Sequence, residues 1–195
     1  HGRSSGRFED ATVGDWLEEA EAVFRRLTRG PQVLIGSSTG GHIALLLLRK
    51  LMAEAPGEAA RIRALVLIAP AWDLTDVMWK DLTDAERREV TERGFSMRSS
   101  PYGDPYPITR RFIEEGRRHL FGDAPFAPGR PVYIIQGLED PVVPAAHARA
   151  LAAKPHLILA DDPTAGMSPA DGKRVVRLLA EMRRVGAGVV IASQR

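Results

Sequence analysis

Short apolar, β-branched runs alternate along the chain with stretches whose apolar residues recur at helical spacing. The runs predict strands at 31–35, 63–68, 131–136, 156–160 and 188–192. The periodic stretches predict helices at 15–27, 41–53, 144–153 and 170–184. Residues 31–35 and 41–53 are almost wholly apolar, which predicts a buried strand and a buried helix. The pattern indicates an α/β fold, a parallel sheet with helices on both faces.

Residues 71–129 interrupt this alternation, because they are polar and rich in proline and aromatic residues. Helical spacing within them predicts two helices, at about 82–94 and 107–119. An insertion of this length between strands is usually functional, and we expect a mainly helical cap. Its aromatic residues fit either an apolar substrate pocket or an ordinary core: Trp72, Trp79, Phe95, Tyr102, Tyr106 and Phe112.

Composition and charge exclude several classes of function and leave the predicted fold unchanged. A chain of 195 residues is long enough for one domain with a core, and its net charge of +2 is spread without a basic stripe. A nucleic-acid partner is therefore not expected. The longest nearly apolar run, Ile43–Leu48, is far shorter than a membrane span. The chain has no cysteine, which excludes thiolate zinc sites and fits a cytoplasmic location.

A G-x-S-x-G motif stands between the predicted strand 31–35 and the apolar helix. In this context the motif is typical of a nucleophile elbow, with Ser38 on a tight turn that projects its hydroxyl above the sheet. We expect glycine at Gly36 and Gly40 because a Cβ there would collide with the strand or the helix. The backbone N–H of Thr39 is the expected oxyanion donor.

Two other interpretations of these residues can be weighed. Gly36 to Ile43 also fits the frame of a phosphate-binding loop, but that loop needs Lys and then Ser or Thr at its end. Here His42 and Ile43 stand at those places, so the phosphate loop is excluded. A plain Gly/Ser turn remains the alternative to the elbow.

The second acidic partner of such a serine is expected just after a later strand. Strand 131–136 runs into Gly137-Leu138-Glu139-Asp140-Pro141, which places Asp140 in that position. The order Ser then Asp is the one expected on this fold. Glu139 lies one position off the pattern, and a solvated turn carboxylate is the alternative.

Residues 1 to about 150 resemble the palmitoyl-protein thioesterase and acyl-glucuronide esterase branch of the α/β-hydrolases. The resemblance is carried by HGRSSGRFEDATVGDW, VLIGSSTGGHIALLL, RALVLIAPAWDLTDVMW, SSPYGDPYPITRRFIEEGRRHL and VYIIQGLEDPVVP. It implies Ser38 as nucleophile, Asp140 as triad acid and residues 71–129 as a cap over the acyl site.

The resemblance also implies a triad histidine after strand 156–160, and there the sequence departs from the pattern. Asp161-Asp162-Pro163 follows that strand, and no histidine comes after His156. The other histidines stand at less suitable places in the pattern: His1, His42, His119 and His147. The chain also begins after the loop that should give the second oxyanion donor, so we expect that the sequence starts partway through a longer protein. We therefore expect impaired catalysis.

Residues from about 148 to 195 are similar to the second half of an ABC-transporter ATPase of the cell-division and lipoprotein-export type. By this resemblance Asp161 would hold Mg²⁺, Asp162 stands at the catalytic Glu, and Gln194 replaces a switch histidine. No Walker A lysine or signature motif accompanies them. The sequence therefore predicts a hydrolase portion at 1–150 and a tail at 151–195 that completes the same sheet.

The sequence favours a serine hydrolase that acts on small-molecule acyl esters or thioesters, with no cofactor and no metal. The alternatives are a fragment of an ABC-transporter ATP-binding subunit and a catalytically silent chimera.

Overall fold

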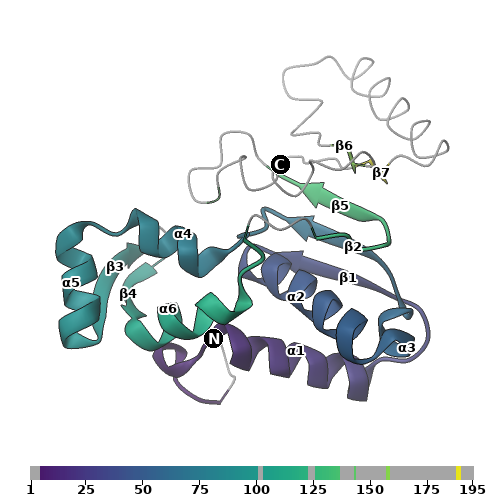
Figure 1. The fold of residues 1–195 in the computed structure, drawn as a ribbon, viewed down its shortest axis with the longest axis horizontal. Coiled ribbons are helices and arrows are strands. Elements are labelled where there is room, and N and C mark those ends of the chain that lie inside the picture. The colour runs from purple at the N-terminus through teal and green to yellow at the C-terminus, as the bar shows by residue number, and fades with distance from the viewer. Residues whose placement is uncertain are drawn as a thin grey trace. The chain divides into compact units, whose positions relative to one another are not determined.

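Three parallel strands, in the order β1–β2–β5, form the main sheet of the protein (Figure 1). They are β1 (Gln32–Ser37), β2 (Ile62–Ile68) and β5 (Val132–Ile135). The predicted strands at 31–35, 63–68 and 131–136 are thereby confirmed. The computed structural model describes residues 5–100, 103–122, 126–136 and 143, with the backbone of 157–158 and 188–189.

The chain divides into two compact units, which are described separately. The sheet unit holds residues 25–72 and 127–195, and the insertion unit holds residues 1–24 and 73–126. The predicted insertion at 71–129 overlaps the second segment of the insertion unit, 73–126, and its role as a cap stays a prediction. The N-terminal segment groups with it, which the sequence pattern did not indicate.

In the sheet unit, helix α2 (Thr39–Glu54) packs against β1 and β2, and the short α3 (Pro56–Ala59) follows it. Leu48 and Leu51 of α2 are fully buried, as are Leu65 and Leu67 of β2. Burial of such side chains stabilises the unit by about 1.5–3 kcal/mol each. The predicted buried helix is confirmed, with bounds slightly wider than 41–53.

Strand β1 is less buried than its composition predicts. Val33 and Ile35 are 53% and 70% exposed, whereas Gly36 is buried. Successive side chains of a strand point to opposite faces, and α2 packs on one face only. The prediction of a buried strand is therefore wrong for Val33 and Ile35.

The insertion unit combines helices with one antiparallel hairpin. Its described elements are η1 (Phe8–Asp10), most of α1 (Val13–Leu27), α4 (Leu74–Asp81), α5 (Asp84–Arg93), β3 (Phe95–Ser100), β4 (Gly103–Thr109), α6 (Arg110–Gly116) and η2 (Arg117–His119). Helices α1 and α5 confirm the predictions at 15–27 and 82–94. The helix predicted at 107–119 is wrong at its start, because residues 107–109 belong to β4.

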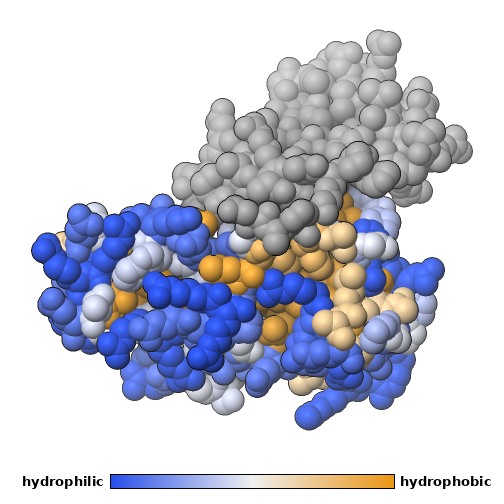
Figure 2. Space-filling model, in the orientation of Figure 1, coloured by the Kyte–Doolittle hydropathy of each residue, from blue (hydrophilic) through white to orange (hydrophobic). Residues whose placement is uncertain are grey.

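A small apolar cluster forms the centre of the insertion unit. It consists of Leu82, Val90, Ile108 and Ile113, with Met78, Trp79, Tyr106 and Phe112 packed against it. The core interpretation therefore holds for these three aromatic residues, and Tyr102 lies outside the described residues. Figure 2 shows that the surface over α5 is largely hydrophilic, as expected for a helix with only Val90 buried.

The ends of the inserted segment are tied together by Asp73. This residue has a left-handed backbone (φ 49°), and its buried carboxylate accepts the N–H groups of Phe121 (2.7 Å) and Gly122 (2.8 Å). Helices α4 and α6 also approach closely, because a Cβ on Gly116 would lie 2.2 Å from Thr75 Cγ2. These contacts hold the two ends of the inserted segment together within the insertion unit.

The described part of the tail is the pair β6 (Leu157–Ile158) and β7 (Gly188–Val189), which form a separate parallel two-stranded sheet. They overlap the strands predicted at 156–160 and 188–192. The helices predicted at 144–153 and 170–184 lie outside the described residues, and extension of the main sheet by the tail stays a prediction. Among the described helices, none combines the length and hydropathy needed to span a membrane.

Candidate active site

Ser38 lies on the turn between β1, which ends at Ser37, and α2, which begins at Thr39. Its backbone is at φ 51° and ψ −121°, and the residue is exposed. A positive φ is costly for a residue with a Cβ, and such strain persists only where the surrounding structure enforces it. The turn therefore has the geometry of the predicted elbow.

Backbone hydrogen bonds hold Ser38 in this conformation. Its N–H donates to the carbonyl of Ile68 at the end of β2 (2.8 Å). Its own carbonyl accepts the N–H groups of Gly41 (2.9 Å) and Ala71 (3.1 Å). The serine is thus tied to the neighbouring strand end and to the first turn of α2. No local pattern in the sequence indicates the contacts with Ile68 and Ala71.

The two predicted elbow glycines differ in their surroundings. A Cβ on Gly36 would lie 2.2 Å from the carbonyl oxygen of Gly40 and 2.7 Å from the nitrogen of Gly41, so glycine is required. A Cβ on Gly40 would meet nothing within 4 Å, and the predicted collision there is wrong. The crowded position is Gly41, where a Cβ would lie 2.9 Å from Pro70 Cβ. Gly40 is the second residue of α2, whereas Gly41 faces Pro70, the second residue after β2.

Thr39 is the first residue of α2, so its N–H lies at the positive end of a helix. No acceptor for this N–H occurs among the described residues. First-turn N–H groups of a helix are available to bind an anion beside them. The position of the group next to Ser38 suits the stabilisation of an oxyanion.

The predicted acid, Asp140, and its competitor Glu139 lie outside the described residues. The described chain on either side consists of Gln136, which is buried after β5, and Val143. The Gln136 side-chain amide donates to the Val143 carbonyl (2.9 Å). This bond brings the two ends of segment 137–142 together after a strand that is parallel to β2.

Two histidines fall within the described residues, and both have structural surroundings. His42 is 2% exposed on α2, and its backbone N–H is 3.4 Å from the Ser38 carbonyl. His119 contacts the Glu115 carboxylate (2.5 Å) within the insertion unit. His1, His147 and His156 lie outside the described residues. No group of three or more acidic or histidine side chains that could hold a metal occurs in the described part of the chain.

The model of the alpha/beta hydrolase family matches residues 1–181, and the chain belongs to that family. The predicted fold class, a parallel sheet with helices on both faces, is confirmed. Because the family match continues to residue 181, it includes much of the segment that resembles an ATPase. The comparisons do not show the ATPase resemblance.

Individual relatives support the hydrolase branch. A crystal structure of an assigned hydrolase from Agrobacterium vitis S4 is 37% identical with a TM-score of 0.76, over 93% of this chain and 72% of that chain. The human palmitoyl-protein thioesterase ABHD10, mitochondrial, is 28% identical over 145 residues, which are 73% of this chain and 45% of that protein. This chain thus spans less than half the length of the curated relatives it matches.

More distant structures agree in fold alone. The alpha/beta hydrolase domain-containing protein 10 from mouse is 24% identical with a TM-score of 0.69, over 94% of this chain and 74% of that chain. Est1E from Butyrivibrio proteoclasticus, solved with ferulic acid, is 18% identical with a TM-score of 0.58, over 95% and 73% of the two chains.

Proposed function

We propose that the chain is a serine hydrolase that cleaves small-molecule acyl esters or thioesters through Ser38. The observation that carries the proposal is the strained, exposed Ser38 between β1 and α2. Membership of the hydrolase family and the curated relatives' thioesterase names support the reaction class. No cofactor is needed for this chemistry.

In the proposed reaction, Ser38 Oγ attacks the acyl carbon and its proton passes to a general base. The carbonyl oxygen becomes an oxyanion, to which the Thr39 N–H donates. The thiolate or alkoxide then leaves with a proton, and water hydrolyses the acyl-serine intermediate. Asp140 has the role of orienting the base, as in a Ser-His-Asp triad.

The sequence has no histidine at the position expected for the general base. By the family resemblance a histidine is expected after β6, and Asp161-Asp162 follows there instead. A serine without an adjacent base stays a weak nucleophile, and removal of one triad member costs several decades in rate. We therefore propose that this chain by itself hydrolyses substrate slowly.

The substrate class rests on the relatives and on the resemblance. Long-chain acyl thioesters are the first choice, because the curated relatives are named palmitoyl-protein thioesterases. Residues 71–129 take the role of the cap in this proposal. The cytoplasmic location also stays a proposal, since those relatives are named mitochondrial.

Hydrolysis of palmitoyl and acetyl thioesters by three proteins tests the function: the wild-type chain, Ser38→Ala and Ser37→Ala. Ser37 is the neighbouring exposed serine at the end of β1, which makes it a matched control. We expect slow turnover in wild type and in Ser37→Ala, and turnover at the buffer rate in Ser38→Ala. Equal rates in wild type and Ser38→Ala would overturn the proposal.

The alternatives from the sequence concern residues 151–195. A nucleotide-binding role rests on Asp161 and Asp162 after an apolar strand, without a phosphate-binding lysine. ATP binding that is lost in Asp161→Asn would favour an ATPase fragment. A chain with neither ATP binding nor Ser38-dependent hydrolysis would be a silent chimera.

A further inference from the structure

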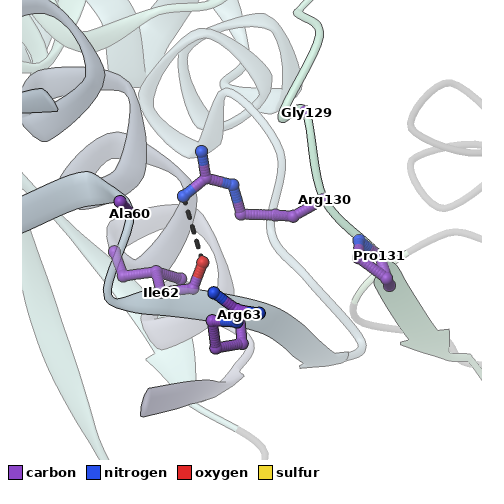
Figure 3. Close-up of a pocket in the computed structure, with 6 residues that line it drawn as sticks. All are labelled: Ala60, Ile62, Arg63, Gly129, Arg130 and Pro131. Carbon is purple, nitrogen blue, oxygen red and sulfur yellow. Dashed lines mark hydrogen bonds between the residues drawn. The ribbon is translucent and has the colours of Figure 1, made fainter. Parts of the chain in front are cut away.

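A pocket of about 290 Å³ lies in the sheet unit, at the amino ends of β2 and β5 (Figure 3). Its lining comes from the turn before β2, the first two residues of β2 and the segment before β5: Ala60, Ile62, Arg63, Gly129, Arg130 and Pro131. Two of these residues are arginines, and no acidic residue occurs among the described residues of the lining. The pocket therefore has an uncompensated positive charge.

Arg130 is held in place by uncharged groups. Its Nη1 donates to the carbonyls of Ile62 (3.1 Å) and Ala59, and its Nε donates to the carbonyl of Pro128 (2.8 Å). Figure 3 shows the guanidinium above the Ile62 carbonyl. Partial burial lowers the pKa of Arg130 from its usual range, because the charged form is desolvated.

These bonds fix the plane of the Arg130 guanidinium and leave its Nη2 hydrogens for another acceptor. No hydrogen bond or ion pair from Nη2 occurs among the described residues. A guanidinium whose orientation is already fixed loses little entropy when it binds an oxyanion. Arg130 is therefore a preorganised donor.

Arg63 supplies the second charge. It is exposed at the beginning of β2, and no hydrogen bond or ion pair of its side chain occurs in the described part of the chain. Glu58 of α3, which precedes β2, forms an ion pair with Arg61 (2.5 Å) and does not line the pocket.

The geometry points to a binding site for a phosphate group at this pocket, held by Arg63 and Arg130. Guanidinium groups bind phosphate oxygens through paired charge-assisted hydrogen bonds, and a dianion balances both arginines. A carboxylate would balance one charge only, so it binds more weakly. This site does not take part in the proposed hydrolysis at Ser38.

The site lies at the opposite end of the strands from Ser38. In a parallel sheet the amino ends of all strands lie on the same side. Ser38 follows the carboxyl end of β1, whereas Arg63 and Arg130 lie at the amino ends of β2 and β5. A bound phosphate therefore does not occupy the space above the nucleophile. We expect phosphate and an acyl substrate to bind at the same time.

Isothermal titration with inorganic phosphate at low ionic strength tests the inference on the full chain. The proteins are wild type, Arg63→Gln and Arg88→Gln, and potassium acetate and potassium chloride serve as comparison salts. Arg88 is an exposed arginine of α5, outside the pocket, whose replacement changes the net charge equally. Among the described residues the Arg63 side chain makes no hydrogen bond or ion pair, so we expect its replacement to leave the fold intact.

We expect saturable phosphate binding to wild type and Arg88→Gln, with weaker binding of acetate. In Arg63→Gln the Kd should rise by about tenfold or more, as expected for loss of a hydrogen bond to a charged group. Unchanged affinity in Arg63→Gln, or equal weakening in Arg88→Gln, would overturn the inference. Absence of saturable binding in wild type would overturn it as well.

Discussion

At the scale of single residues, the site depends on one strained serine and on the space that glycines leave beside it. Ser38 has φ 51°, and its carbonyl and N–H together make hydrogen bonds to Ile68, Gly41 and Ala71. These bonds offset a strain of about 1–3 kcal/mol. The turn can form only if α2 starts very close to β1, which is why Gly36 lies against Gly40 and Gly41.

Replacement of Gly36 by alanine should therefore destabilise the protein much more than the same change at Gly40. At Gly36 the new Cβ meets backbone atoms at 2.2–2.7 Å, which cannot move as a side chain can. We expect a loss of about 1–3 kcal/mol in the free energy of unfolding, measured by urea denaturation.

Gly40→Ala is the matched control, because its Cβ meets nothing within 4 Å and the position is the second residue of a helix. We expect no loss there, and a gain of up to about 1 kcal/mol from the better helix former. Equal losses in the two variants would contradict the described packing of the elbow.

At the scale of elements, the helix beginnings carry specific side-chain caps. Before α1, the Thr12 N–H donates to Asp15 Oδ2 (2.8 Å), and the Asp15 N–H donates to Thr12 Oγ1 (3.2 Å). The Thr12 hydroxyl also donates to the same carboxylate (2.7 Å). This reciprocal arrangement is a capping box. The Thr12 hydroxyl, followed by the backbone N–H of the same residue, is the main reason that the pKa of Asp15 is lowered.

A lowered pKa in the folded state makes this cap dependent on pH. Its stabilisation is present above the unfolded pKa of Asp15, near 4, and is lost as the pH falls through the lower folded value. Thr12→Val should cost about 1 kcal/mol at pH 7. The difference from wild type should shrink at pH 3, when unfolding by urea is measured at both pH values.

Thr91→Val is a suitable control for this measurement. Thr91 is exposed on α5 and donates only to the Arg87 carbonyl (2.8 Å), with no carboxylate involved. Its effect should be small and equal at both pH values. A pH-independent effect of Thr12→Val would contradict the assigned role of Asp15.

The same scale shows where sequence patterns succeed and where they fail. Apolar strands and α2 could be predicted, because their burial requires a long apolar run. The hairpin could not, since β3 reads Phe-Ser-Met-Arg-Ser-Ser and β4 contains Pro105 and Pro107. Neither strand has an alternating β-branched pattern, and prolines normally argue against a strand. The hairpin is fixed by pairing between the two strands and by Ile108, which is 1% exposed in the core.

At the scale of the whole molecule, the tight turn at Ser38 could be predicted from the sequence, whereas the contacts that surround it could not. The motif around Ser38 lies within a few residues, so the sequence contains its geometry. The bonds to Ile68 and Ala71 join segments about thirty residues apart, and no local pattern shows them. The same holds for Arg130, whose backbone partners Ala59 and Ile62 are about seventy residues away.

The central claim is that Ser38 is the reactive nucleophile of this chain. It is tested most directly by incubation with a fluorophosphonate, followed by intact-mass measurement and peptide mapping. We predict one slowly formed adduct on Ser38, absent in Ser38→Ala and retained in Ser37→Ala. No adduct on the wild-type chain, or an adduct that persists in Ser38→Ala, would contradict the account.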